Sequence, residues 1–248
     1  MKILSYEAYL FDLDGTLLDL DFRKFVGTYY ELLARKIDHL IPRETFLPAL
    51  EHGLRAVCAN DGSRTNQEVF FEAFEEVCGP SDERFMKALE EFYEHDFGQL
   101  GSHGKPFEDM RDVLYELKNR GKKIALATNP VFPRRAVEHR IEWAGLGGFP
   151  FDLITTYETM HATKPSPRYF YEVLEKVGTL ADRALMVGDD PDLDLPAAAA
   201  GIDVVLIRDG DAGTVASEAH PETEARIVSM ERSEFVRAVL RELGQERC

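Results

Sequence analysis

The chain has 248 residues, of which 44% are hydrophobic and 30% charged, a composition typical of a globular protein with a sizeable core. The formal net charge of −16 argues against nucleic acids and anionic membranes as partners, because both attract basic surfaces. The three cysteines, Cys58, Cys78 and Cys248, are widely spaced and form no metal-binding pattern, so a reduced, cytoplasmic compartment is expected.

The first predicted element is a buried strand over the apolar residues 8–11, which is followed by Asp12, Asp14 and the turn residue Gly15. Residues two positions apart on a strand point to the same side, so the two carboxylates should lie together. Two negative charges so near each other repel strongly unless a cation or a proton lies between them. A Mg²⁺ ion could supply that positive charge. Alternatively, these residues simply form a turn at the end of the strand.

The next part of the chain, residues 21–100, is predicted to be entirely helical. Apolar and aromatic residues recur there at helical spacing in four stretches, and Ser81 is a suitable N-cap for the last of them. We interpret the segment as a small helical bundle inserted after the first strand. The four stretches cover residues 22–33, 46–57, 69–77 and 85–93.

The glycine-rich stretch 98–106 is predicted to be a linker, and beyond it helical and strand patterns alternate. Such alternation predicts an α/β fold, a Rossmann-like doubly wound parallel sheet with helices on both faces. Residues 1–20 and 101–248 would form this domain, and residues 21–100 the all-helical insert. Strands are expected at residues 123–127, 151–155, 184–187 and 204–207, with a possible edge strand at 227–230.

Polar side chains follow several of these strands. Since the carboxyl ends of parallel strands share one edge of the sheet, groups distant in sequence can meet there. Several carboxylates, an ammonium and a hydroxyl would then form one site, which suits metal-assisted phosphoryl transfer. The residues are Asp12 and Asp14, Thr128 and Asn129, Lys164, and the group Asp189, Asp190, Asp192 and Asp194.

Four motifs in this order resemble those of the haloacid dehalogenase superfamily, and the resemblance extends over nearly the whole chain. The helical insert resembles the cap of the helical-cap, phosphatase-like class of that superfamily. The motifs are Asp12-x-Asp14-Gly15-Thr16, Thr128-Asn129, Lys164-Pro165, and Gly188-Asp189-Asp190 with Asp194.

The resemblance implies a role for each catalytic residue. Asp12 would be the nucleophile and carry an aspartyl-phosphate, and Asp14 would act as general acid and then as general base. Thr128 and Lys164 would bind and neutralise the phosphoryl group, with Asn129 helping to orient it.

The resemblance also implies a Mg²⁺ cofactor bound by Asp12, the backbone carbonyl of Asp14, and Asp189. A further carboxylate would support the metal site, and the sequence leaves open whether it is Asp190 or Asp194. This region departs mildly from the family pattern, because Asp190 replaces a frequent Ser and Leu193 a frequent Asn.

The expected function is therefore Mg²⁺-dependent hydrolysis of a small phosphate monoester. The alternatives are a sugar-phosphate mutase of the same fold and a non-catalytic binding or regulatory protein. A dehalogenase is disfavoured, because that branch does not use the second aspartate, which is present here as Asp14. The cap would set the substrate, and the candidate residues near its start and in its second helix are Asp19, Asp21, Phe22, His52 and Arg55. The substrate and the oligomeric state stay open.

Overall fold

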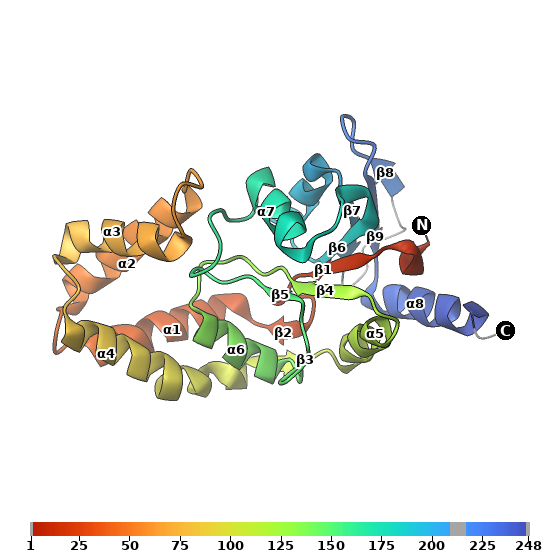
Figure 1. The fold of residues 1–248 in the computed structure, drawn as a ribbon. Coiled ribbons are helices and arrows are strands. Elements are labelled where there is room, and N and C mark those ends of the chain that lie inside the picture. Colours follow the sequence, from red (N-terminus) through yellow and green to blue (C-terminus); the bar gives the residue numbers. More distant parts are fainter. Residues whose placement is uncertain (1, 209–216, 247–248) are drawn as a thin grey trace.

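The computed structural model describes residues 2–208 and 217–246, and its centre is a seven-stranded sheet (Figure 1). Its strand order is β5-β4-β1-β6-β7-β9-β8, and every neighbouring pair is parallel except β8–β9. The predicted parallel α/β sheet is thereby confirmed. The strands are β1 (Ala8–Phe11), β4 (Lys123–Leu126), β5 (Leu153–Ile154), β6 (Ala184–Gly188), β7 (Asp203–Ile207), β8 (Ser217–Ala219) and β9 (Arg226–Met230).

One described strand of this seven-stranded sheet was not predicted. The segment at 227–230 was expected at the edge, but β8 pairs antiparallel with β9 and takes that position. A strand of three residues is too short to show an alternating pattern, which explains why the sequence did not reveal it.

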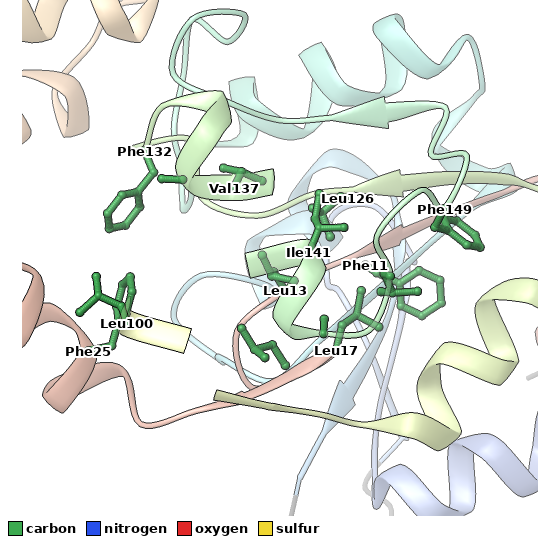
Figure 2. Close-up of a cluster of buried hydrophobic side chains, with 14 of the residues drawn as sticks. Phe11, Leu13, Leu17, Phe25, Leu100, Leu126, Phe132, Val137, Ile141 and Phe149 are labelled. Carbon is green, nitrogen blue, oxygen red and sulfur yellow. The ribbon is translucent and has the colours of Figure 1, made fainter. Parts of the chain in front are cut away.

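The sheet is buried on both faces. Tyr9 and Phe11 of β1 belong to one hydrophobic cluster, whereas Ala8 and Leu10 belong to a second, as the alternation of side chains along a strand requires. Figure 2 shows part of the first cluster, including Phe11. That cluster includes residues from α5 (Glu108–Asn119), α6 (Arg134–Trp143) and α8 (Arg232–Glu246); the second includes residues from α7 (Pro167–Val177) and the 3₁₀-helix at Leu195–Ala200.

Between β1 and β4 along the chain, helices lie where the sequence predicted them. They gather to one side of the sheet (Figure 1). The N-cap of the fourth is Asp82, whose carboxylate accepts the Phe85 N–H at 2.9 Å, so the expectation of Ser81 was wrong. The helices are α1 (Phe22–Ile37), α2 (Arg43–Cys58), α3 (Asn66–Cys78) and α4 (Glu83–Glu91), followed by a π-helical turn (Phe92–Asp96).

The chain enters and leaves this helical region through two paired segments. β2 (Leu18–Leu20) runs antiparallel to β3 (Gly104–Pro106), which follows a 3₁₀-helix at Phe97–His103. The expected linker at 98–106 therefore consists of most of this 3₁₀-helix and of β3, and only β3 is paired with another strand. The division into a domain of 1–20 and 101–248 and a cap of 21–100 stays a prediction.

Two further observations concern the helices and the cysteines. Within residues 2–208 and 217–246, no helix is both long and apolar enough to cross a membrane. Cys58 and Cys78 are free thiols, and Cys248 lies outside the described residues.

The start of α3 is fixed to loops at the carboxyl edge of the sheet. The backbone N–H groups of Asn66 and Gln67, which no helical carbonyl can accept, donate to the carbonyls of Met160 at 2.8 Å and Tyr157 at 2.8 Å. The buried Asn66 amide also donates to the Pro130 and Ala162 carbonyls, both at 3.2 Å. One side chain thus ties the helical region to two loops of the sheet domain.

Replacing Asn66 by Ala should lower the free energy of unfolding by about 1–3 kcal/mol, because it leaves two buried carbonyls without a donor. Urea denaturation measures the change. The matched control is Asn119→Ala at the exposed end of α5, for which we expect a change of less than about 0.5 kcal/mol. Equal stabilities of the two variants would contradict the fixing role of Asn66.

Candidate active site

The predicted site residues come together at the carboxyl edge of three adjacent strands. Asp12 directly follows β1, whose last residue pairs with Leu126 of β4 and with Val187 of β6. Thr128 and Asp189 follow those two neighbouring strands within two residues. Parallel pairing therefore brings side chains more than a hundred residues apart onto one edge.

Lys164 lies between two carboxylates at the centre of this edge. Its Nζ is 2.6 Å from Asp12 Oδ1 and 2.6 Å from Asp194 Oδ1, and its side chain is only 1% exposed. Burial alone would lower the pKa of Lys164, but the two neighbouring carboxylates outweigh it and raise the pKa above its ordinary value. Burial also raises the pKa of Asp12, and the Lys164 charge opposes that rise. The ammonium is therefore held charged beside the predicted nucleophile.

The second aspartate forms a separate ion pair that sequence reasoning missed. Asp14 Oδ2 accepts a hydrogen bond from Arg140 Nη1 at 2.5 Å, and the Arg140 side chain is 1% exposed. Burial raises the pKa of Asp14, while Arg140 acts against it. A signal was present in the sequence, because Arg140 shares the helical spacing of the apolar residues Val137 and Ile141 and so falls on the buried face of α6.

Within the part of the chain that the structure describes, three polar atoms of this pair have no hydrogen-bond partner. They are Asp14 Oδ1 and the Nε and Nη2 atoms of Arg140, and all three are buried. Buried polar groups normally find partners, so unpaired ones at a cavity are suited to binding a ligand. The guanidinium also lies 4.7 Å from the centre of the Phe132 ring, which fixes its orientation.

The aspartates that follow β6 have different hydrogen-bond and ion-pair partners. Asp189 accepts the Thr16 hydroxyl at 3.2 Å, and burial raises the pKa of Asp189 to about 6. Asp190 Oδ1 accepts the backbone N–H of Asp192 at 2.8 Å, so its carboxylate stabilises a turn. Asp194 is fully buried against Lys164. Of the two residues that the sequence left open, Asp194 therefore lies at the centre of the site.

Two glycines permit this close approach of carboxylates. A Cβ at Gly15 would collide with the Asp189 carboxylate, and the φ of +83° at Gly15 disfavours other residues. A Cβ at Gly188 would collide in the same way with Asp194.

The carboxylates fit a divalent cation. One oxygen each of Asp12, Asp189 and Asp194 lies within 4.8 Å of the others. Three carboxylates against the single ammonium of Lys164 leave a formal excess of two negative charges, which a Mg²⁺ ion would neutralise. The side chain of Asp14 is not in this group; its predicted metal contact is through the backbone carbonyl.

A cavity of about 330 Å³ opens onto these groups. Thr128 and Asn129 line it, and the side-chain oxygen Oδ1 of Asn129 accepts the Lys164 backbone N–H at 3.2 Å, which fixes the loop that carries the lysine. The other lining residues are Asp12, Asp14, Gly15, Leu20, Phe22, Val131, Phe132, Arg140, Asp189, Asp190 and Leu193.

Replacing Lys164 by Met should lower the free energy of unfolding by about 3–5 kcal/mol in the presence of a chelator, because two buried carboxylates lose their counter-charge. Denaturant titration measures this change. Lys105→Met, on the exposed strand β3, is the control and should change stability by less than about 0.5 kcal/mol. A loss no larger than that of the control would show that Lys164 does not balance the two carboxylates.

Comparison with known proteins agrees with this architecture. Pyrophosphatase PpaX from Bacillus cereus (strain AH820) is 24% identical over 187 residues, 75% of this chain and 76% of that protein. A HAD phosphatase from Thermococcus onnurineus superposes with a TM-score of 0.55 at 24% identity, covering 94% of this chain and 97% of that one. CbbY from Rhodobacter sphaeroides, solved with xylulose-(1,5)bisphosphate, gives a TM-score of 0.50 at 19% identity over 83% and 87% of the two chains.

The family model for haloacid dehalogenase-like hydrolases matches residues 6–201, which is most of the chain. The prediction of a hydrolase with this fold is confirmed. The protein belongs to the haloacid dehalogenase-like hydrolase family.

Proposed function

We propose that the protein is a Mg²⁺-dependent phosphatase that hydrolyses a small phosphate monoester through an aspartyl-phosphate on Asp12. The observation that carries this proposal is the buried Lys164 ammonium, 2.6 Å from Asp12 and beside two further carboxylates. This arrangement suits phosphoryl transfer, which depends on positioning and on neutralising charge. The similarity to a pyrophosphatase supports the same chemistry.

In the first step, an Asp12 oxygen forms a bond to phosphorus as the ester P–O bond breaks. The departing alcohol oxygen takes a proton from Asp14. Asp14 Oδ1 is the atom suited to hold that proton, since it has no partner among residues 2–208 and 217–246 while Oδ2 accepts from Arg140. Lys164 offsets the charge on Asp12 and on the phosphoryl oxygens, and Thr128 and Asn129 orient the phosphoryl group.

In the second step, water attacks the phosphorus and the Asp12–phosphorus bond breaks, which releases inorganic phosphate. Asp14, now a carboxylate, accepts the proton of the attacking water and so returns to its starting state. The ion pair with Arg140 keeps Asp14 in one orientation through both steps.

The residues that would hold Mg²⁺ are Asp12, Asp189 and the backbone carbonyl of Asp14, with Asp194 beside them. A bound Mg²⁺ would supply Lewis-acid neutralisation of the phosphoryl charge.

Residues 21–100 would act as the cap over this site, on a core of residues 1–20 and 101–248. Phe22, the first residue of α1, lines the catalytic cavity, which supports a cap in contact with the substrate. The free thiols of Cys58 and Cys78 support a cytoplasmic location.

Replacing Asp12 by Asn should reduce kcat for a phosphate monoester by at least about 10³-fold, because the nucleophile is lost while the shape of the side chain is kept. Phosphate release at saturating Mg²⁺ measures the effect. Asp192→Asn, an exposed residue of the same acidic segment, is the control and should retain full activity. Wild-type rates in Asp12→Asn would rule out the covalent mechanism.

A chelator should abolish activity and added Mg²⁺ should restore it. In Asp189→Asn, the Mg²⁺ concentration for half-maximal activity should rise by about tenfold or more, since even residues that only support metal ligands have effects of this size. A Mg²⁺ titration of the rate compares this variant with Asp192→Asn. Full activity in excess chelator would exclude the metal from the mechanism.

A further inference from the structure

A second cavity, of about 200 Å³, lies among the helices α1–α4 and adjoins the catalytic cavity. The two cavities share Phe22, Val131 and Phe132 as lining residues. These three side chains border both cavities, so a substrate group that extends from phosphorus past them would enter the second cavity. An apolar cavity of about 150 Å³ is large enough to hold benzene, so this one can take a ring or a short alkyl chain.

The lining of this second cavity is apolar and aromatic. Phe46, Phe70, Phe74 and Phe85 contribute to it from three different helices. The hydroxyl groups of Tyr29 and Tyr93 share a hydrogen bond of 2.7 Å, so each oxygen has a polar partner. Burial raises the pKa of both tyrosines, which keeps them uncharged.

Among the described residues, no charged side chain lines the second cavity. The cap candidates His52 and Arg55 lie outside it and contact Glu76 and Glu51 instead. A carboxylate or a second phosphate on the substrate would therefore lose its hydration without gaining a counter-ion, which is strongly unfavourable. An uncharged apolar group would gain from the same burial.

We propose that the alcohol part of the substrate is uncharged and largely apolar, and that it occupies this second cavity while the phosphoryl group lies at Asp12. This inference rests on the proposed phosphatase function, whose substrate class it specifies.

A homologous series of n-alkyl phosphates tests the proposal on the wild-type protein with Mg²⁺. From methyl to hexyl phosphate, kcat/KM should rise about fourfold per methylene, the equivalent of about 0.8 kcal/mol for each CH₂ buried. Pyrophosphate and 3-phosphoglycerate, which place a charge beyond the ester oxygen, should be poorer substrates than butyl phosphate. A flat series, or a preference for the charged compounds, would overturn the proposal while leaving the phosphatase function intact.

A pair of variants locates the effect in the second cavity. Val26 lines it from α1, so Val26→Phe should lower the ratio of kcat/KM for hexyl phosphate to that for methyl phosphate at least tenfold. The matched control is Val77→Phe on α3, where the side chain is 42% exposed and outside the cavity, and here the ratio should not change. Equal ratios in both variants would overturn the assignment of the cavity.

A binding measurement separates this inference from the proposed catalysis. Hexylphosphonate and methylphosphonate carry no ester bond to hydrolyse, so calorimetry on the wild-type protein does not depend on turnover. Hexylphosphonate should bind at least tenfold more tightly and with a more negative heat-capacity change, the mark of apolar burial. Equal affinities and heat-capacity changes would overturn the proposal even if phosphatase activity is present. If no ester is hydrolysed, the proposed function fails, and tight binding of hexylphosphonate would still support the apolar site.

Discussion

The buried ammonium of Lys164 is the interaction on which the rest of the site depends. It lies between Asp12 and Asp194, at a place where the sheet edge gathers carboxylates that would otherwise repel each other. Much of the surrounding structure keeps it there. Asn129 accepts the backbone N–H of the lysine, and Asn66 binds the carbonyl of Ala162 two residues earlier. The helical region thus contributes directly to holding a charge at the end of β1.

A second ion pair keeps the two aspartates proposed as catalytic, Asp12 and Asp14, distinct. Asp14 is paired with Arg140, whereas Asp12 is paired with Lys164, so each carboxylate has its own cation and its own environment. Two nearby carboxylates in different environments can take different protonation states, which is what a nucleophile and a general acid require. Among the described residues Asp14 Oδ1 has no hydrogen-bond partner, which suits it to the proposed proton transfer, and the excess negative charge near Asp189 favours a divalent ion.

The sequence predicted the sheet and the meeting of the four motifs, because both follow from strong local patterns: an apolar strand, a polar group after it, and the single carboxyl edge of a parallel sheet. It did not predict what depends on tertiary contacts. The helical spacing of Arg140 indicates that it lies on the buried face of α6, but only the packing of α6 shows that its guanidinium meets Asp14. The choice of Asp194 over Asp190 also needed the structure, since only the turn geometry shows that the Asp190 carboxylate is used by the backbone.

The net charge of the chain bears on how each of the two cavities would contribute to binding the proposed substrate. At −16, the protein as a whole would repel the phosphate dianion of the proposed substrate, so attraction must come from local cations at the candidate site. Lys164 and Arg140 are both buried in ion pairs and can offset only part of that repulsion. Burial of apolar surface does not depend on charge and is not weakened by the overall field. An apolar cavity next to the charged one therefore supplies binding free energy from a source that the acidic surface leaves unaffected, which favours an uncharged group on the substrate.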